Sequence, residues 1–194
     1  MKRIGITGGI GCGKSTVVEA FKKLGVASFV ADKVGASYYD DPDFLTQVRN
    51  LFGDGVFRTD GSVDKRSIAA RVFADKDALA RLNALVHPRV MDDFECFCRE
   101  HEKEDYVLFE SAILYDYGFD RMMDKVVCVY LDLEERLRRL EQRDGVPREV
   151  LLLRVANQLS AEEMMRRADY VILNYEGNPR ERQVAYVDKV LRIK

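Results

Sequence analysis

The chain has 194 residues, a length that suggests one large domain or one domain with an inserted lobe. Its 31 Lys and Arg residues nearly balance its 33 Asp and Glu residues, giving a formal net charge of −2. This balance disfavours a general nucleic-acid binder, which usually carries a basic excess. Hydrophobic residues make up 47% and charged residues 33% of the chain, which excludes a disordered polyelectrolyte and indicates a globular protein.

No apolar run approaches the roughly 18 residues of a membrane span. The apolar stretch after the charged N-terminus is too short and too rich in glycine for a signal peptide, so we expect a cytoplasmic protein. In that compartment the four cysteines should be free thiols. Cys96 and Cys98 should lie on different faces of a helix rather than bind a metal together.

The N-terminal segment alternates between strand and helix. Residues 3–8 and 26–31 are short and apolar, and they predict two strands. Between them, the spacing of apolar residues predicts a helix over 14–24, which Gly25 would end.

A long stretch of helical periodicity follows, from about residue 41 to residue 104. Asp41-Pro42 is typical of a helix start, and Asp64 is expected to cap a helix over 65–73. His87-Pro88 is expected to break or restart the helix that contains it, because proline lacks a backbone N–H.

The C-terminal half again alternates. Strands are predicted over 106–109, 125–131 and 168–173, and helices over 133–143, 148–159 and 179–191. Short apolar strands separated by helices predict an α/β fold with a five-stranded, mainly parallel sheet flanked by helices.

Residues 8–15 read Gly-Gly-Ile-Gly-Cys-Gly-Lys-Ser and match the phosphate-loop pattern G-x-x-x-x-G-K-[ST]. The pattern lies between a predicted strand and a predicted helix, which is the context it requires. Glycines allow the backbone to approach phosphate oxygens closely, and the N–H groups of the loop and helix start bind them. Lys14 would contact the β- and γ-phosphates, Ser15 would offer a hydroxyl to Mg²⁺, and Thr16 would support the phosphates.

Two other classes of phosphate-loop protein are disfavoured. Asp32-Lys33-Val34-Gly35 matches the D-x-x-G of GTPase switches, but it follows the second strand, soon after the phosphate loop, and no N-K-x-D occurs in the chain. The chain is also short for a motor ATPase. A small-molecule kinase remains the best interpretation.

Such a kinase needs a carboxylate near the acceptor hydroxyl. Asp32 follows the second predicted strand and Glu110 follows the third. The carboxyl ends of parallel strands share one crevice, so both side chains should face the phosphate loop. Asp32 is the candidate base, or else only a helix cap. Glu110 is the candidate for Mg²⁺ or its water shell, or else a structural carboxylate.

The kinase also needs cations over the transferring phosphoryl group, often on a lid. Residues 134–154 contain six arginines: Arg136, Arg138, Arg139, Arg143, Arg148 and Arg154. Arg139 and Arg143 are four residues apart and share a helix face. The alternative is a solvated helix with pairs such as Glu135 and Arg139.

We therefore expect residues 1–194 to form a single P-loop kinase domain in three parts. They are a core (1–32, 105–132 and 165–194), a helical acceptor-binding lobe (about 33–104) and an Arg-rich helical lid (about 133–164).

In this order and spacing, the motifs resemble those of the dephospho-coenzyme A kinase family over nearly the whole chain. The segments that carry the resemblance are the phosphate loop from Thr7 to Thr16, Ala31-Asp32, Asp64-Lys65-Arg66 through Val72-Phe73, Leu82 through His87-Pro88, Glu110 through Asp116, Arg143-Asp144, Arg154 through Gln158, and Ala168-Asp169 through Asn174.

The sequence departs from the family pattern at several positions. Val30 replaces the first carboxylate of the family's Asp-x-Asp, whereas Asp32 keeps the second. Glu110 stands for the usual Asp and Asp116 for the usual Glu, which changes the reach of each carboxylate.

The resemblance implies that ATP phosphorylates the ribose 3′-hydroxyl of dephospho-coenzyme A, with Mg²⁺ as cofactor. It implies catalytic roles for Asp32, Lys14 and Arg143. It implies acceptor binding by Asp32, Arg66 and His87. It also implies metal contacts by Ser15 and by Glu110, with Glu110 bound to Mg²⁺ directly or through water. ATP would be bound by Gly11, Cys12, Gly13, Lys14, Ser15, Thr16, Arg139 and Arg143. No nucleic-acid, membrane or obligatory protein partner is expected.

Two alternatives stay open at this point. One is another P-loop kinase that acts on a nucleotide or a small alcohol. The other is a nucleotide-dependent binding protein without catalytic activity.

Overall fold

A computed structural model of the chain describes residues 1–193, apart from the side chain of Phe73. The chain divides into two compact units, one formed by residues 1–30 and 98–194 and the other by residues 31–97. The chain passes into the second unit after Val30 and returns to the first unit at Cys98, inside the long helix α5 (Lys76–Glu100).

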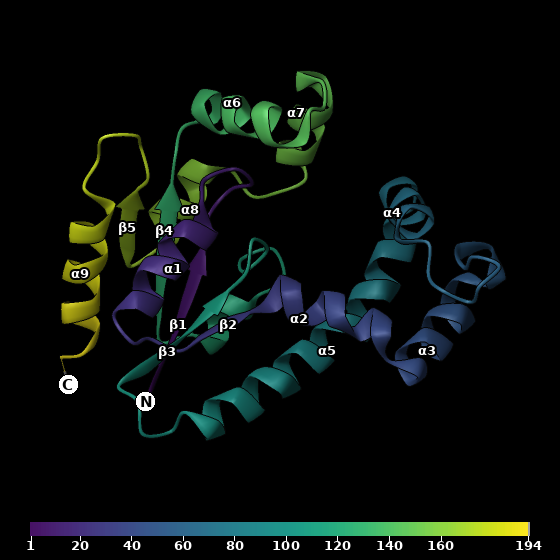
Figure 1. Ribbon diagram of the computed structural model, residues 1–194, viewed down its shortest axis with the longest axis horizontal. Coiled ribbons are helices and arrows are strands. Elements are labelled where there is room, and N and C mark those ends of the chain that lie inside the picture. Colours follow the sequence, from purple (N-terminus) through teal and green to yellow (C-terminus); the bar gives the residue numbers. More distant parts are fainter. Residues whose placement is uncertain (194) are drawn as a thin grey trace. The chain divides into compact units, whose positions relative to one another are not determined.

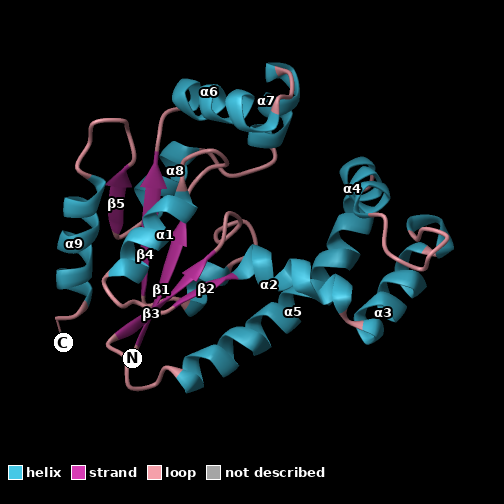
Figure 2. Ribbon diagram, viewed as in Figure 1, coloured by secondary structure: helices cyan, strands magenta, loops and turns pink. Residues whose placement is uncertain are grey.

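The first unit is built on a parallel sheet (Figures 1 and 2). Its strands are β1 (Lys2–Thr7), β2 (Ser28–Val30), β3 (Tyr106–Glu110), β4 (Lys125–Tyr130) and β5 (Tyr170–Leu173). They lie in the order β2-β3-β1-β4-β5, and every pair is parallel. The expected α/β fold with a five-stranded parallel sheet is therefore confirmed, although β2 is shorter than expected.

Helices complete this unit. They are α1 (Lys14–Lys23), the 3-10 helix η3 (Phe119–Met122), α6 (Leu133–Asp144), α7 (Arg148–Ala156), α8 (Ala161–Arg167) and α9 (Arg180–Leu191). The helix expected over 148–159 ends at Ala156, and the short α8 follows it, which the prediction missed.

The core of the first unit lies on both faces of the sheet. On one face, Ile4 and Val129 pack with Phe21 of α1 and Val187 of α9 in a single buried cluster. On the other face, the ring of Phe109 stacks on Phe29 and meets Phe119 edge-on, each at 5.7 Å between centroids. Because both faces are buried, the inner residues of β3 and β4 (106–109 and 126–129) are continuously apolar, as expected for a parallel sheet.

The carboxyl ends of the strands form one edge of the sheet. In Figure 1 the arrows of β1 and β4 point toward α6 and α7. The loop after β1 leads to α1, and the connection after β4 leads to α6. Ligands of open parallel sheets bind at this edge, so the geometry there is described below.

The second unit is helical. It contains α2 (Ala31–Ser37), η1 (Tyr38–Asp40), α3 (Pro42–Phe52), η2 (Asp54–Val56), α4 (Lys65–Ala74) and most of α5 (Lys76–Glu100). Its own core surrounds Phe44, whose ring lies 5.2 Å from that of Tyr39 and 5.2 Å from the Arg89 guanidinium. Asp64 caps α4 as expected, since its side chain accepts a hydrogen bond from Arg66 N. A helix starts at Pro42 as expected, and the Asp41 side chain caps it by accepting a hydrogen bond from Asp43 N.

The break expected at His87-Pro88 is wrong. α5 runs without interruption from Lys76 to Glu100 with Pro88 inside it. Proline removes the hydrogen bond that its N–H would donate to the carbonyl of Ala84. The apolar face that α5 buries on both sides of this point, including Leu82 and Val90, keeps the helix continuous, since packing overrides local propensity.

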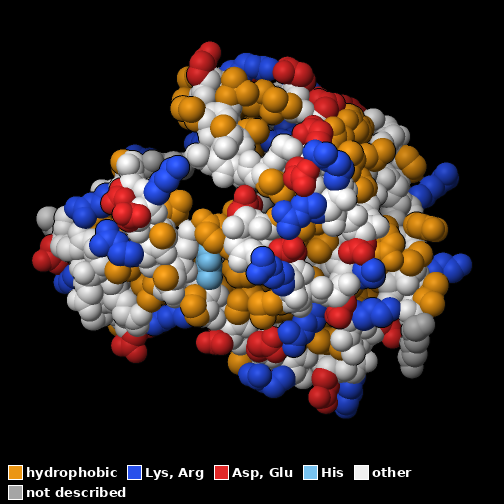
Figure 3. Space-filling view, turned by 180° about the vertical axis from the view of Figure 1, so that it is seen from behind, with side chains coloured by type: hydrophobic (Ala, Val, Ile, Leu, Met, Phe, Trp, Pro, Cys, Tyr) orange, Lys and Arg blue, Asp and Glu red, His pale blue; other side chains and the backbone are white. Residues whose placement is uncertain are grey.

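Among the described residues, no helix is long and apolar enough to cross a membrane. Cys12, Cys98 and Cys128 are buried and Cys96 is exposed, all as free thiols. Figure 3 shows Lys and Arg side chains mixed with Asp and Glu side chains over the visible face, without a large area of one sign.

Candidate active site

The phosphate loop, residues 8–15, connects β1 to α1 as the sequence predicted. Gly13 precedes α1 with φ +86, a left-handed conformation that favours glycine, and no side chain caps the helix. The first N–H groups of a helix have no partner within it, and its dipole favours an anion there. The loop therefore presents a site for phosphate.

Lys14 is already held across this loop. Its Nζ donates a hydrogen bond to the Gly8 carbonyl at 2.9 Å, which folds the side chain back over residues 8–13. Gly8 itself has φ +151, and a Cβ there would collide with the Val129 carbonyl. The loop is thus closely packed on the end of β4, with its lysine at the phosphate-binding side.

Asn174, which follows β5, also forms a hydrogen bond to the phosphate loop. Its side chain is 4% exposed, and its Nδ2 donates to the Cys12 carbonyl at 2.8 Å. A Cβ on Gly13 would collide with this amide group. The side chain of Cys12 is fully buried. A contact of Cys12 with ATP, as predicted, would therefore be made by its backbone.

This packing predicts a large effect of Gly13→Ala. The substitution imposes a left-handed φ on alanine and displaces the Asn174 amide, which together should lower the free energy of unfolding by roughly 2–5 kcal/mol. Gly25→Ala is the matched control, because Gly25 also has a left-handed φ of +81 but has no atom within 4 Å of its Cβ position. Urea unfolding of both variants measures the difference. Equal losses in the two variants would show that the contact with Asn174 contributes nothing.

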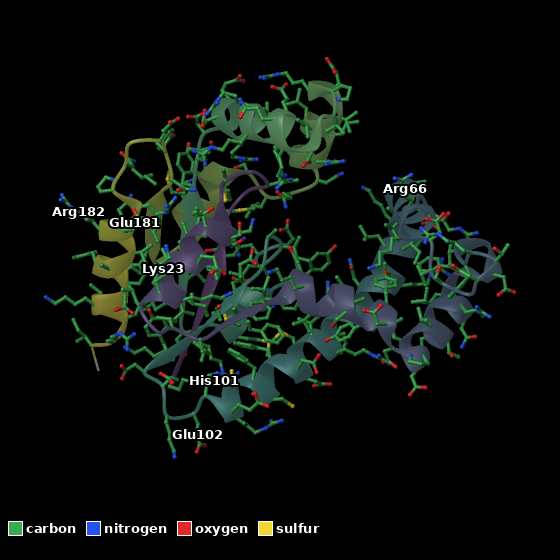
Figure 4. The ribbon with its side chains drawn as sticks, viewed as in Figure 1. Lys23, Arg66, His101, Glu102, Glu181 and Arg182 are labelled. Atoms are coloured by element: carbon green, nitrogen blue, oxygen red, sulfur yellow. The ribbon has the colours of Figure 1, made fainter. Side chains whose placement is uncertain are left out.

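A polar cleft of about 590 Å³ adjoins the loop at the start of α1. Its lining comes from α1, α6, α9 and the β5–α9 connection: Thr16, Arg138, Arg139, Gln142, Asn174, Tyr175, Glu176, Gly177, Asn178, Arg180 and Glu181. Figure 4 labels Glu181 on α9 at this end of the unit. The cleft is rich in cations and amides, which suits a phosphorylated, hydrogen-bonding ligand.

Arg139 links α6 to this cleft. Its Nη2 donates to the Asn174 carbonyl at 3.0 Å, and its Nε donates to Glu135 at 3.0 Å. Arg138 also pairs with Glu135, and the two guanidinium groups lower the pKa of the Glu135 carboxyl to about 2. The pairing of Glu135 with Arg139 that the alternative interpretation named is present, yet Arg139 still lies against the loop, 3.7 Å from the Cβ position of Gly13.

Arg143 is placed differently from Arg139. Its side chain is 63% exposed and pairs with Asp144, which also pairs with Arg154 at 3.0 Å. These contacts lower the pKa of the Asp144 carboxyl. Arg143 lies in the last turn of α6 and is not among the residues that line the cleft.

The two predicted metal ligands lie at the same sheet edge. Ser15 is exposed in the first turn of α1, and Glu110 is 7% exposed at the end of β3, in register with Ile6 of β1. The buried Thr7 hydroxyl, one residue beyond Ile6, has no hydrogen-bond partner within the described residues. No group of three or more His, Cys, Asp or Glu side chains in residues 1–193 could hold a metal on its own.

The predicted acceptor-site residues lie in the second unit. Asp32 is exposed in the first turn of α2, two residues beyond the end of β2. Arg66 is exposed near the start of α4 (Figure 4). His87 is half-buried in α5, and burial lowers the pKa of its imidazole, which favours the neutral form.

For three residues, contacts with the phosphate loop were not predicted. Asn174 and Gln158 occur in the motifs that carry the family resemblance, and Arg136 was grouped with the lid arginines. The structure brings all three to the loop from distant parts of the chain. Only their type was visible in the sequence, since buried amides and guanidinium groups require partners.

Comparisons with known proteins point to one family. A family model described as dephospho-CoA kinase matches residues 2–179. The dephospho-CoA kinase of Deinococcus radiodurans is 38% identical over 193 residues, which cover 98% of this chain and 91% of that protein. The dephospho-CoA kinase of Corynebacterium glutamicum is 35% identical over 179 residues, which cover 90% of this chain and 88% of that protein.

Solved structures show the same fold. The crystal structure of TT1252 from Thermus thermophilus is 30% identical and superposes with a TM-score of 0.84, covering 100% of this chain and 98% of that one. Shikimate kinase from Bacteroides thetaiotaomicron, at 16% identity and a TM-score of 0.53 over 99% of both chains, shares the fold alone.

Proposed function

Because this chain belongs to the dephospho-CoA kinase family, we propose that it transfers the γ-phosphoryl group of ATP to the ribose 3′-hydroxyl of dephospho-coenzyme A. The products are coenzyme A and ADP. The observation that carries the proposal is the phosphate loop with Lys14 held across it and a polar cleft beside it.

ATP would bind with its phosphates on the loop and its nucleoside in the cleft. The backbone of residues 11–16 surrounds the phosphates, and Lys14 exchanges its bond to the Gly8 carbonyl for the β- and γ-phosphates. Thr16 and Arg139, both predicted ATP contacts, line the cleft. Arg143 would reach the phosphoryl group only by leaving Asp144.

The residues present fit Mg²⁺. This ion prefers oxygen ligands, keeps several waters and binds through substrate phosphates rather than through a full protein cage. The exposed Ser15 hydroxyl and the buried Glu110 carboxylate at one sheet edge supply that donor set. A bound Mg²⁺ would neutralise phosphate charge.

Asp32 would orient or deprotonate the acceptor hydroxyl. It lies two residues beyond Val30, so chain connectivity keeps its Cα within about 7.6 Å of that of Val30. Val30 pairs with Glu110 in the sheet, so Asp32 follows the end of a strand by two residues. With valine at position 30, Asp32 would do this work without a second carboxylate at that position.

The second unit would bind the acceptor, with Arg66 and His87 as contacts. Arg66 offers an exposed guanidinium group for phosphate. Because burial favours the neutral form of His87, it would act as a hydrogen-bonding group rather than as a cation. The other partners are small molecules, and we expect the protein to work in the cytoplasm without nucleic acid, membrane or obligatory protein partners.

An acceptor panel tests the proposal. Turnover of Mg·ATP should require dephospho-coenzyme A, and neither a nucleoside monophosphate nor shikimate should replace it. Turnover with one of these and not with dephospho-coenzyme A would favour another P-loop kinase. Binding of ATP without ADP release from any acceptor would favour a nucleotide-dependent binding protein.

A further inference from the structure

Ile10, at the tip of the phosphate loop, is held by residues far away in the chain. Its N–H donates to Gln158 Oε1 at 2.9 Å, and its carbonyl accepts from Arg136 Nε at 2.9 Å. Gln158 and Arg136 lie 148 and 126 residues away. The backbone N–H and the carbonyl of Ile10 are therefore both hydrogen-bonded to side chains outside the loop, one from α6 and one from the residues after α7.

The side chain of Ile10 is part of the same arrangement. It packs against a cluster of buried residues, Leu137, Leu140 and Leu151, that joins α6 to α7. The loop tip is thus one piece of the hydrophobic core of the α6–α7 segment (residues 133–156).

Two glycines at variable positions of the phosphate-loop pattern allow this approach. A Cβ on Gly9 would lie 2.6 Å from the Arg136 guanidinium carbon, and a Cβ on Gly11 would lie 2.9 Å from Leu140 Cγ. In this chain these glycines therefore serve the packing of α6 on the loop. They are required even before any phosphate binds.

The residues that hold Ile10 are themselves fixed to the unit. Arg136 is 3% exposed. Gln158 N donates to the Val155 carbonyl, and Leu159 N donates to Asp116 Oδ1 at 3.2 Å. Asp116 belongs to the segment that follows β3, so the attachment runs from the loop through Gln158 to the sheet.

From these contacts we propose that Gln158 and Arg136 are positioning residues for the phosphate loop. They hold Ile10 so that the loop keeps its phosphate-binding shape, and they couple that shape to the α6–α7 segment. Neither residue needs to touch ATP. The inference rests on the proposed function only in that the ligand of the loop is a nucleoside di- or triphosphate.

The test compares Gln158→Leu, which removes the acceptor oxygen at similar size, with Gln158→Glu, which keeps an acceptor oxygen. Leu153→Gln is the control, because Leu153 is 68% exposed on α7. Without dephospho-coenzyme A present, hydrogen exchange at the Ile10 amide should be about 10-fold faster in Gln158→Leu than in the parent protein. In Gln158→Glu the exchange rate should be near that of the parent protein. The dissociation constant for ADP should rise about 5- to 10-fold in Gln158→Leu and stay unchanged in Leu153→Gln.

Steady-state kinetics separates positioning from a general structural defect. In Gln158→Leu the KM for ATP should rise with the ADP dissociation constant, whereas the KM for dephospho-coenzyme A should stay within about twofold. If Gln158→Leu does not fold, Ile10→Ser against Ile10→Val tests the same attachment through the side chain, with weaker ADP binding expected only for serine.

Three results would overturn the inference: unchanged ADP affinity despite faster exchange at Ile10, equal increases in both KM values, or equal ADP affinity in the serine and valine variants. The exchange and ADP measurements need no acceptor. They therefore remain decisive even if dephospho-coenzyme A proves not to be the substrate, and a failure of either proposal can be recognised separately.

Discussion

Replacement of Asp32 by Asn is expected to lower kcat by about 100-fold or more, the scale of a lost general base. Asparagine keeps the size and exposure of the side chain in the first turn of α2 but cannot accept the proton of the acceptor hydroxyl. The KM for ATP should stay within about twofold, because the loop and the cleft do not include Asp32. Initial rates at varied ATP and dephospho-coenzyme A measure both constants.

Asp40→Asn provides the control for this experiment. Asp40 is also an exposed carboxylate in the second unit, at the end of η1, and its loss should leave kcat unchanged. If the kcat of Asp32→Asn is close to that of Asp40→Asn, Asp32 is not the catalytic base.

Replacement of Lys14 by Met is expected to lower kcat/KM for ATP by about 1,000-fold, as for other cations that stabilise a transferring phosphoryl group. Methionine keeps the length of the apolar stem but loses both the charge and the bond to the Gly8 carbonyl. The free energy of unfolding should change far less than activity, since one partly exposed hydrogen bond contributes about 1 kcal/mol.

Lys22→Met is the matched control on the same helix. Lys22 pairs with Glu19 at 2.8 Å on the exposed side of α1, where an ion pair contributes little. Its activity should equal that of the parent protein. A loss in Lys14→Met no larger than in Lys22→Met would contradict the assignment of Lys14 to the phosphates.

Local sequence signals predicted most of the fold. The strand, loop and helix of residues 2–23 are fixed by neighbouring residues, because glycines and the apolar spacing act within one turn or strand. The predicted helix break at Pro88 was wrong because it depends on non-local packing. Its outcome depends on what Leu82 and Val90 pack against in the folded unit, and that information is not local.

The site was predictable to the extent that its chemistry resides in a motif. Lys14 and Ser15 are recognisable from spacing alone. The contacts of Ile10 with Arg136 and Gln158, and of Cys12 with Asn174, cross more than half of the chain. No periodicity records such pairs. Likewise, spacing places Arg139 and Arg143 on one helix face, but only the fold shows that Arg139 reaches Asn174 while Arg143 pairs with Asp144.

The measurement that tests the central claim most directly is the identity of the product formed from Mg·ATP and dephospho-coenzyme A. Mass spectrometry and ³¹P NMR should show coenzyme A with the new phosphate on the ribose 3′-oxygen, formed in equal amount to ADP. ADP formed at the same rate without dephospho-coenzyme A, or a phosphate at any other position, would contradict the account.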